Sequence, residues 1–503
     1  MIAAFPSGRI ILENGDERSR EPLTAVPDDS VAVIVREAVA LEAAFARLRA
    51  TERREPYPEY ASRREALKAL ASAIRRCTPD MVEAANADFG GRSHSTTKLG
   101  DVATMLRELD YQRSSLRRWM APESRRLARH FRPARGEVQF QPLGVVGVIA
   151  PWNYPFRLAL GPAAAALAAG NRVLLKPSEF APRSSALIAE LVREAQLEEQ
   201  IEVVQGGERV AAALCSLPLD HLFFTGSTPV GRRVMRAASE HLTPVTLELG
   251  GKCPAVIHPS ASLERAARRI VAGKLFNAGQ TCMAPDHVWV HRSQAARAQG
   301  IFEAQIRAQY PWLISNPEYT AIINREHLQR LERLLADAKE RGAQVNVVNP
   351  SAERFGPDTN KLPPALISRV SPEMAIAREE IFGPLLPLRE YDDLDEVIAA
   401  LHDGGSPLAA YYFDDDRARC SEFLRRSRTG GACINDVMLH SIQDDLPFGG
   451  VGASGMGRYH GKEGFETFSH KRAVFYQTRR NWSELLIPPY GSLAKRVIEW
   501  LAR

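Results

Sequence analysis

Between residues 143 and 249, short apolar runs alternate with segments of helical spacing, and this alternation constrains the fold more than any other feature. The short runs have the length of strands and lie at 145–150, 173–175, 201–204 and 222–224. The longer segments have the length and spacing of helices and lie at 157–169 and 185–195. Strands and helices that alternate in this way form a parallel sheet with helices on its faces, so we expect an α/β fold.

A second series of the same kind runs from Pro254 to Asn435 and indicates a second α/β domain. Its apolar runs lie at 255–257, 288–290 and 409–413, and its predicted helices lie near 263–276 and 325–341. Residues 31–119 show helical spacing alone, so we expect them to pack on something larger. At 503 residues the chain exceeds the size of a single core, and two or three domains are expected.

Cysteine usage and the lack of long apolar runs limit the class of protein. The six cysteines are scattered without a Cys-x-x-Cys pair, which argues against a disulfide framework and against a zinc site, so we expect no metal. Residues 1–27 are charged and lack the apolar stretch of a secretory signal. No apolar run approaches the roughly 20 residues that span a bilayer. A cytoplasmic protein without a membrane span is therefore expected.

Two basic segments raise the question of a charged partner. Arginines gather between Arg113 and Arg135, although the net charge of the whole chain is only +5. We interpret them as a solvated helix or a subunit contact and expect no nucleic acid, because the segment matches no nucleic-acid-binding module. The amphipathic tail from Ser492 to Arg503 can touch a membrane or pack on this protein or a second copy, and we favour packing.

Three residues have the character of a covalent catalytic site. Cys282 follows a Gly-Gln-Thr turn at the end of an apolar, helical run, although most cysteines are simply buried hydrophobes. Glu248 ends an apolar strand beside two glycines, where desolvation raises the pKa of a carboxyl; the alternative is a glutamate bound by backbone amides. Asn153 lies in a turn between two prolines, where its amide can donate to an oxyanion or merely satisfy the backbone.

Two other segments have the character of a nucleotide site. Residues 224–231 join a strand to a helix, with Thr228 suited to the N-cap and Pro229 to the first helical position. Free amides at such a helix start can face a pyrophosphate, although a simple capped turn is about equally consistent. Lys176 and Glu179 follow a strand, where they can bind ribose hydroxyls or remain solvent-exposed side chains.

Together these segments resemble the NAD(P)-dependent aldehyde dehydrogenase superfamily, in its order and at its spacing, from about Val31 to the C-terminus. The resemblance implies two open parallel-sheet α/β domains and a small oligomerisation arm. It implies oxidation of an aldehyde to a carboxylic acid, with Cys282 as the nucleophile, Glu248 as the base and Asn153 in the oxyanion hole. It implies an N-terminal extension (1–30), a dinucleotide-binding domain (31–123, 143–250 and 456–472), a catalytic domain (251–455) and an arm with a tail (124–142 and 473–503).

The same resemblance implies NAD as the cofactor, with NADP also accepted. By resemblance, Glu380 holds the nicotinamide ribose, Phe382 lies near the ring, and Lys176 with Glu179 holds the adenosine ribose. The other cofactor-binding residues that it implies are Trp152, Gly206, Gly226, Ser227, Val230 and Leu249. We expect Glu179 to favour the free 2′-hydroxyl of NAD.

Segments 446–452, 454–457, 459–461 and 468–470 are similar to the class 3 branch and to bacterial coniferyl aldehyde dehydrogenases. This implies a homodimer and an aromatic, coniferyl-like aldehyde, with a broad range of medium-chain and aromatic aldehydes as the alternative. A cofactor-free thiol esterase is a further alternative. Cys253 and Met283 depart from the usual residues at their positions without removing a catalytic group. His440 near a thiol suggests a Cys–His pair, but we expect it in the substrate funnel, within the 435–443 loop.

Overall fold

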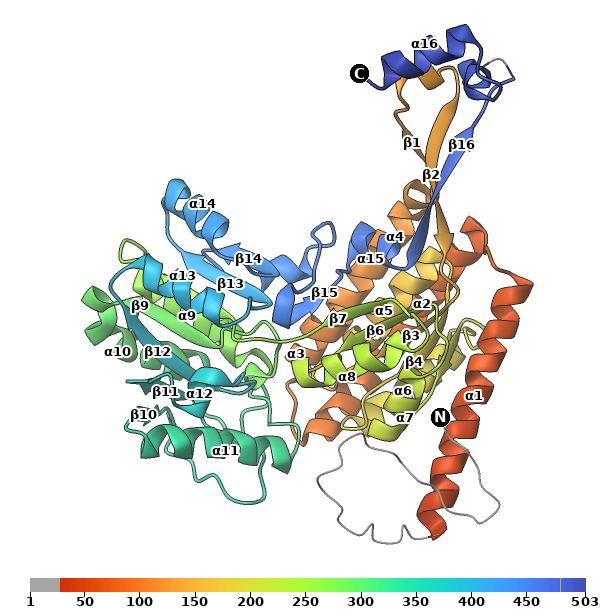
Figure 1. The fold of residues 1–503 in the computed structure, drawn as a ribbon. Helices are drawn as coiled ribbons and strands as arrows, with labels where there is room; N and C mark the ends of the chain where they lie inside the picture. The colour runs from red at the N-terminus through yellow and green to blue at the C-terminus, as the bar shows by residue number, and fades with distance from the viewer. Residues whose placement is uncertain (1–27, 480) are drawn as a thin grey trace, which may run out of the picture.

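The computed structural model describes residues 28–479 and 481–503 of the chain. Two lobes, each built on its own sheet, lie side by side, and a narrow arm extends from one of them (Figure 1). The predictions for residues 1–27 lie outside the described residues. No helix within the described ranges is both long and apolar enough to cross a membrane.

The first lobe contains a six-stranded sheet in the order β15-β7-β6-β3-β4-β5, in which only β15 is antiparallel to its neighbour. Its strands are β3 (Val145–Ile149), β4 (Arg172–Lys176), β5 (Ile201–Val203), β6 (His221–Thr225), β7 (Val245–Glu248) and β15 (Gly455–Met456). Its helices are α5 (Arg157–Ala169), α6 (Pro182–Glu194), α7 (Glu208–Cys215) and α8 (Thr228–Ser239). The strands and helices predicted for 143–249 are confirmed.

The helices that precede this sheet pack on it or on the helices that follow it, as expected. They are α1 (Asp28–Arg54), α2 (Tyr60–Phe89), α3 (His94–Thr96) and α4 (Thr104–Met120), with a π-helical turn η1 (Thr97–Ala103) before α4. The apolar stripe Leu67, Leu70 and Ile74 of α2 is fully buried, and α2 and α4 pack against α5. The periodicity therefore identified the faces that these helices bury.

The second lobe contains a seven-stranded sheet in the order β10-β11-β12-β9-β8-β13-β14, in which only β10 pairs antiparallel. Its strands are β8 (Pro254–Ile257), β9 (His287–His291), β10 (Gln344–Val347), β11 (Ala365–Ser368), β12 (Leu385–Tyr391), β13 (Ala409–Phe413) and β14 (Gly431–Ile434). Its helices are α9 (Leu263–Leu275), α10 (Arg292–Gln309), α11 (Arg325–Glu340), α12 (Ala375–Arg378), α13 (Leu394–Asp403) and α14 (Arg417–Arg426). The second α/β unit predicted from 254–435 is confirmed.

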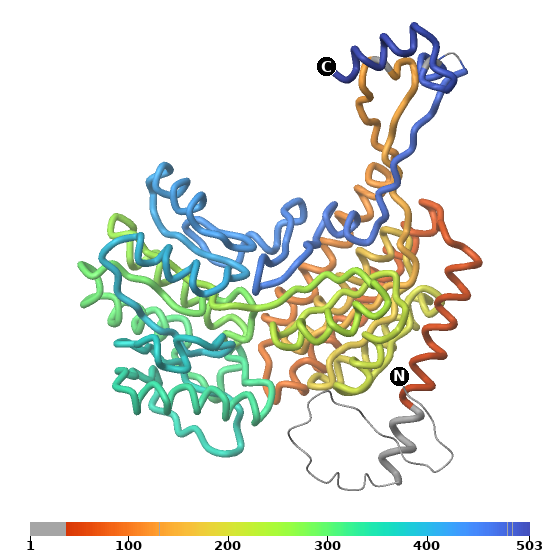
Figure 2. The backbone as a smooth tube through the Cα atoms, viewed as in Figure 1, coloured from red at the N-terminus to blue at the C-terminus, as the bar shows by residue number. Residues whose placement is uncertain are grey.

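The arm is a three-stranded antiparallel sheet of β1 (Glu123–Arg125), β2 (Arg135–Pro142) and β16 (Ser469–Tyr476), with η2 (Arg129–Phe131) before β2. Figure 2 shows the end of the chain returning beside residues near 130, and Arg135 lies opposite Tyr476 in the ladder. Helix α15 (Gly461–Thr467) leads into β16, and η6 (Trp482–Leu486) and α16 (Ser492–Leu501) follow it. Phe475, Trp482 and Trp500 are exposed on this arm.

Candidate active site

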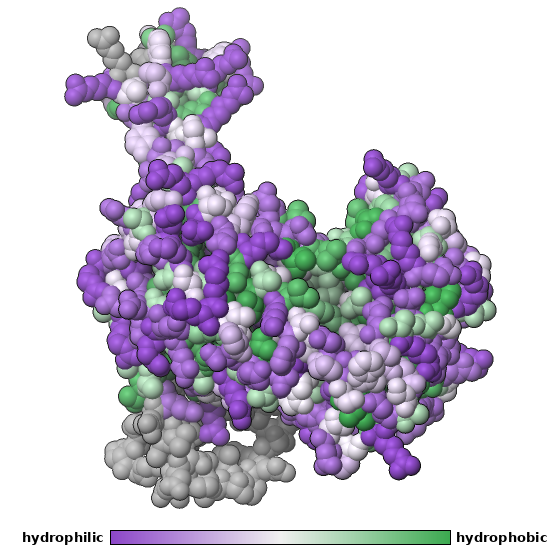
Figure 3. Space-filling view, turned by 180° about the vertical axis from the view of Figure 1, so that it is seen from behind, coloured by the Kyte–Doolittle hydropathy of each residue, from purple (hydrophilic) through white to green (hydrophobic). Residues whose placement is uncertain are grey.

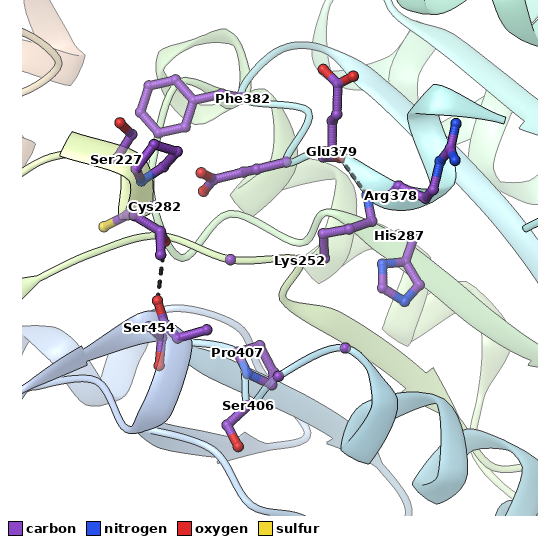
Figure 4. Close-up of a pocket in the computed structure, with 18 of the residues that line it drawn as sticks. Ser227, Lys252, Cys282, His287, Arg378, Glu379, Phe382, Ser406, Pro407 and Ser454 are labelled. Carbon is purple, nitrogen blue, oxygen red and sulfur yellow. Dashed lines mark hydrogen bonds between the residues drawn. The ribbon is translucent and has the colours of Figure 1, made fainter. Parts of the chain in front are cut away.

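The carboxyl end of β7, the start of α8 and two loops of the second lobe line one cleft of about 1080 Å³. In open α/β sheets, ligands bind beyond the carboxyl ends of the strands, which is where this cleft lies. Eight of the predicted site residues line it, from both lobes: Trp152, Asn153, Gly226, Ser227, Glu248, Cys282, Glu380 and Phe382. Figure 4 shows Ser227, Cys282 and Phe382 converging from three different segments.

The nucleophile loop is held by a strained turn and a buried amide. In the short helix η3 (Phe276–Gly279), Asn277 and Ala278 adopt left-handed φ values of 54° and 52°. The buried Gln280 side chain donates to the carbonyl oxygens of Asn277 and Ala321, at 3.0 Å each, and accepts from the Ile323 amide. These three bonds fix the loop against the segment of Ala321 and Ile323, and so fix the position of Cys282, which follows the loop in sequence.

Gly279 is required by close packing within the same loop. Its φ is +79°, and a Cβ added there would lie 2.2 Å from the carbonyl oxygen of Gly383. Any side chain would therefore push apart the Cys282 loop and the segment that carries Phe382. The glycine and the glutamine of the Asn-x-Gly-Gln pattern therefore each have a structural reason.

Burial keeps the Cys282 thiol protonated at rest. Burial raises the pKa of Cys282 to about 12, and the carboxylates of Glu380 and Glu248 add to this rise, while Arg157 opposes it. A thiolate must therefore form as the substrate reacts, with a base that takes the proton.

Glu248 has the properties of such a base. It ends β7, is 3% exposed, and neither carboxyl oxygen has a hydrogen-bond partner among the described residues. Burial raises its pKa well above 4.5. The alternative interpretation, a glutamate bound by backbone amides, is wrong, because no backbone amide bonds it.

Asn153 is fixed against the nucleophile loop. It is 3% exposed, and its Nδ2 donates to the carbonyl oxygen of Gln280 at 3.1 Å. Its own main-chain oxygen accepts from Arg92 at 2.6 Å and from Asn277 at 3.1 Å. Arg92 and Asn277 were missed by sequence reasoning, because their bonds to Asn153 span 61 and 124 residues of sequence and no local pattern marks them.

Cys253, which departs from the usual residue at its position, makes two hydrogen bonds. Its buried thiol lies 3.4 Å from the carbonyl oxygen of Cys282, to which it donates, and it accepts from the Ala409 amide at 3.3 Å. The thiol therefore joins the nucleophile loop to β13, and the departure noted in the sequence leaves the loop supported.

A partly buried ion pair holds the segment that carries Glu380 and Phe382. Lys252 Nζ lies 2.5 Å from Asp286 Oδ1 and donates to the carbonyl oxygen of Glu379 at 2.8 Å (Figure 4). Asp286 Oδ2 accepts from the Ile381 amide at 2.9 Å. Sequence reasoning missed Lys252, although it stands directly after the two glycines that follow Glu248.

The chemistry of Glu380 and Phe382 suits the sugar and ring of a nicotinamide nucleotide. Burial raises the pKa of Glu380 to about 7, while the Gly251 amide, which bonds it, opposes the rise. A Cβ on Gly250 would lie 2.4 Å from Glu380 Oε2, so the glycine makes room for this carboxyl. The Phe382 ring meets the Trp152 ring edge-on at 5.4 Å, which forms an apolar wall beside the carboxyl.

At the other end of the cleft, the predicted N-cap is wrong by one residue. Ser227 is the N-cap of α8, with extended φ and ψ of −78° and 151°, and Thr228 is already helical. Pro229 is therefore the second helical residue, and the Thr228 hydroxyl donates to the Ala453 carbonyl oxygen at 3.0 Å instead of capping the helix. The helix start still lines the cleft, where its amides and dipole suit a phosphate.

Five of the predicted cofactor residues do not line this cleft: Lys176, Glu179, Gly206, Val230 and Leu249. Lys176 is buried at the end of β4, and its Nζ donates to Glu179 Oε2 at 2.9 Å. Leu249 is buried, and a Cβ on Gly231 would lie 2.7 Å from it. Their roles in cofactor binding therefore stay predictions.

The donor set of the cleft fits a dinucleotide. It offers a helix start for an anion, the Glu380 carboxyl for hydroxyls, an apolar wall from Trp152 and Phe382, and unpaired oxygens on Glu248. Within the described ranges, no group of three or more His, Cys, Asp or Glu side chains is placed to hold a metal ion.

His440 is not paired with the nucleophile. Its Nδ1 lies 3.2 Å from the thiol of Cys433, and its backbone amide also approaches that sulfur. Burial lowers the pKa of His440 to about 4, so it is a neutral imidazole. The Cys–His alternative for Cys282 therefore has no support in the geometry.

Comparisons with known proteins agree on one family. The sequence model of the aldehyde dehydrogenase family matches residues 17–474. The chain is 44% identical to a probable coniferyl aldehyde dehydrogenase of Pseudomonas aeruginosa, over 91% of this chain and 95% of that protein. It is 46% identical to a coniferyl aldehyde dehydrogenase of a Pseudomonas species, over 82% of this chain and 85% of that protein.

Solved structures give the same result. The substrate-bound structure of Staphylococcus aureus AldH matches with a TM-score of 0.86 at 36% identity, over 92% of this chain and 99% of that chain. An NADP-dependent enzyme of Escherichia coli and an NAD-dependent aldehyde dehydrogenase of Sinorhizobium meliloti match at 27% and 28% identity, each with a TM-score of 0.80. They cover 88% of this chain and 91% and 88% of their own chains, respectively.

Proposed function

This chain belongs to the aldehyde dehydrogenase family, and from that premise we propose that it oxidises an aromatic aldehyde to the acid through a covalent bond to Cys282. A nicotinamide cofactor serves the family. The observation that carries the proposal is the shared cleft of Cys282, Glu248 and Asn153, in which both Glu248 oxygens are unpaired. A thiol beside a free, buried base is the arrangement that nucleophilic catalysis requires.

The first step forms a carbon–sulfur bond. As the Cys282 sulfur attacks the carbonyl carbon, its proton passes to Glu248, whose raised pKa makes it able to take that proton. Asn153 Nδ2 and the Cys282 amide donate to the oxygen as it becomes negative. The loop bonds of Gln280 hold both donors in place before the substrate arrives.

The second stage breaks the same bond. A nicotinamide cofactor held along the cleft by Glu380 and Phe382 would supply the hydride acceptor that the thiohemiacetal on Cys282 needs to become a thioester. Glu248, after releasing its proton to solvent, removes a proton from water, and the hydroxide attacks the thioester. The carboxylic acid leaves, and the Cys282 sulfur regains its proton.

The aldehyde that we propose is coniferyl-like. The support is the 44% and 46% identity to proteins described as coniferyl aldehyde dehydrogenases, over most of both chains. Family membership disfavours the cofactor-free esterase. Such an enzyme also has no use for the Glu380 carboxyl and the Phe382 ring, which suit a nicotinamide nucleotide.

For the cofactor we propose NAD in preference to NADP. Glu179 is bonded to Lys176 at the end of β4, and a carboxylate at that position repels a 2′-phosphate. We also propose a cytoplasmic homodimer that assembles through the arm, and the domain boundaries given above. The support for the dimer is the apolar surface that Phe475, Trp482 and Trp500 expose on a narrow projection.

An absorbance assay for NADH with a panel of aromatic and aliphatic aldehydes tests the proposal. Wild type should reduce NAD with coniferyl aldehyde, and Cys282→Ala should not. Cys420→Ala is a matched control, because Cys420 is a buried thiol of α14 outside the cleft. Cofactor reduction that survives in Cys282→Ala, or higher kcat/KM on medium-chain aliphatic aldehydes, would contradict the corresponding part of the proposal.

A further inference from the structure

Among the buried polar atoms that lack hydrogen-bond partners within residues 28–479 and 481–503, four belong to side chains grouped around Arg157. They are Gln112 Oε1, Arg157 Nε, His440 Nε2 and His460 Nε2. Gln112 is 1% exposed and His460 is 4% exposed. Since roughly 90% or more of buried polar groups in proteins are paired, several unpaired atoms in one region indicate a missing partner.

Both histidines lie near one aromatic ring, that of Phe448. Phe448 stacks on His460, with ring centroids 5.2 Å apart and planes inclined by 20°, and its centroid is 6.2 Å from that of His440. Tyr459 meets His460 edge-on at 4.2 Å. The imidazoles are therefore held in a rigid aromatic stack that leaves each Nε2 without a partner.

Arg157 lies beside this stack. Its Nη2 donates to the carbonyl oxygen of Ser441, the neighbour of His440, at 3.0 Å. Burial lowers the pKa of His460 well below 6.5, and the charges of Arg157 and Arg107 lower it further. The Arg157 guanidinium therefore lies near two neutral imidazoles. Its Nε has no hydrogen-bond partner among the described residues.

The same groups adjoin the nucleophile. Besides the burial that raises the pKa of Cys282, the charge of Arg157 acts on that thiol and opposes the rise. Tyr411, whose hydroxyl donates to the carbonyl oxygen of Met283, has its ring centroid 6.4 Å from that of His440. The stack therefore reaches the residue that follows Cys282.

Helix α4 adds an acid and an amide. Glu108 is 5% exposed, and burial raises its pKa to about 7, while the charge of Arg157 opposes the rise. Gln112, one turn later, donates to Glu108 Oε1 at 3.3 Å and leaves its own Oε1 unpaired. A carboxyl that stands near half-ionisation beside a guanidinium can donate to or accept from a hydroxyl.

Hydrophobic side chains gather where the two lobes meet, on the face opposite to that of Figure 1 (Figure 3). Leu439 and Leu446, which lie before and after His440 in the sequence, are exposed. A site that holds unpaired polar atoms discriminates against purely apolar ligands, because such ligands would leave these atoms unsatisfied.

We propose that Arg157, Glu108, His440 and His460 form a polar subsite that binds a ring hydroxyl of the aldehyde, at the end remote from its carbonyl group. The inference rests on the proposed function and deepens it, since coniferyl aldehyde carries such a hydroxyl. Arg157 Nε donates to the hydroxyl oxygen, and an imidazole Nε2 or the Glu108 carboxyl accepts its proton. Phe448 and Tyr459 pack beside the aromatic ring.

The test compares two aldehydes of equal size, 4-hydroxycinnamaldehyde and 4-methylcinnamaldehyde, by kcat/KM. Wild type should prefer the hydroxyl compound at least about tenfold, because the methyl group leaves the buried polar atoms unpaired. In Arg157→Leu this ratio should fall toward one. Arg193→Leu is the matched control, because Arg193 is exposed near the end of α6, and it should keep the wild-type ratio.

Glu108→Gln and His460→Asn provide the same readout if Arg157→Leu does not fold, and each should lower the ratio. A wild-type ratio near one overturns the subsite and indicates that ordered water satisfies these atoms. A wild-type preference that persists in all three variants also overturns it. If wild type oxidises none of the aldehydes with either cofactor, the proposed function itself fails, which is a different result.

Discussion

The Arg92 side chain donates a hydrogen bond of 2.6 Å to the main-chain oxygen of Asn153. Its other terminal nitrogen lies 2.9 Å from Asp101, and both side chains of this ion pair are fully buried. Asp101 in turn accepts from the amides of Phe156 and Arg157, at 3.2 and 3.0 Å. The ion pair therefore fastens both ends of the turn that carries Asn153.

Arg92→Met should destabilise the protein and misplace Asn153. Removing one partner of a buried ion pair costs about 3–5 kcal/mol, since the other charge is left unpaired. Urea unfolding should show this loss, and kcat should fall as well. Arg47→Met removes an exposed partner of Glu202 and should cost less than about 1 kcal/mol. An unchanged urea midpoint in Arg92→Met would contradict the structural role.

Substitution of Arg92 and Asp101 together should recover part of the lost stability. In Arg92→Met with Asp101→Asn, no unpaired charge is left buried, so the double variant should be more stable than Arg92→Met alone. Unfolding curves of the two variants, recorded side by side, check this. A double variant that is less stable than Arg92→Met would show that Asp101 acts mainly through its backbone bonds.

Glu248→Gln should slow thioester hydrolysis more than cofactor reduction. Without the base, steady-state kcat should fall by about 100-fold or more, while rapid mixing still detects some NADH in the first turnover. Because burial raises the pKa of Glu248 above 4.5 and the carboxylate is the active form, wild-type hydrolysis should speed up as pH rises through that raised pKa. The Glu248→Gln variant should not show this rise of the hydrolysis rate with pH. Normal turnover in Glu248→Gln would rule out this base.

Glu179→Gln should improve the use of NADP relative to NAD. The substitution removes the charge that repels a 2′-phosphate but keeps a side chain that can bond Lys176. Steady-state kinetics with both cofactors should show the NADP to NAD ratio of kcat/KM rising by about tenfold, which is the effect of roughly 1.4 kcal/mol. Glu190→Gln, exposed on α6, is the matched control. A lower KM for NADP than for NAD in wild type would overturn the preference.

Phe475→Glu should weaken the proposed homodimer. Phe475 is 48% exposed on β16, which forms one edge of the arm sheet, and a charge there is unfavourable in an apolar interface. Light scattering coupled to gel filtration should find twice the chain mass of 55.6 kDa for wild type and a smaller mass for the variant. Leu242→Glu, 89% exposed on the first lobe, should not change the mass. A monomeric wild type would end the dimer proposal.

The local elements were predictable because their signals are local. The helix over 157–169 and the strands near 145, 173 and 222 follow from spacing within ten or so residues, and the structure confirms them. Thr228 shows the limit of such signals. Both Ser227 and Thr228 can cap a helix, and the choice depends on a bond from Thr228 to Ala453, which is 225 residues away in sequence.

The sequence by itself determined the two α/β units and eight of the residues that line the cleft, because periodicity and short motifs are carried by neighbouring residues. Only the tertiary structure decided that Glu248 has no partner, that Arg92 anchors Asn153, and that Lys252 holds the Glu380 segment. It alone brought Arg157 beside His440 and His460, which are about 300 residues away. Burial sets the pKa of a carboxyl, and long-range contacts set the partner of a charge. Burial and long-range contacts both depend on residues far away in the sequence, so the neighbouring residues do not reveal them.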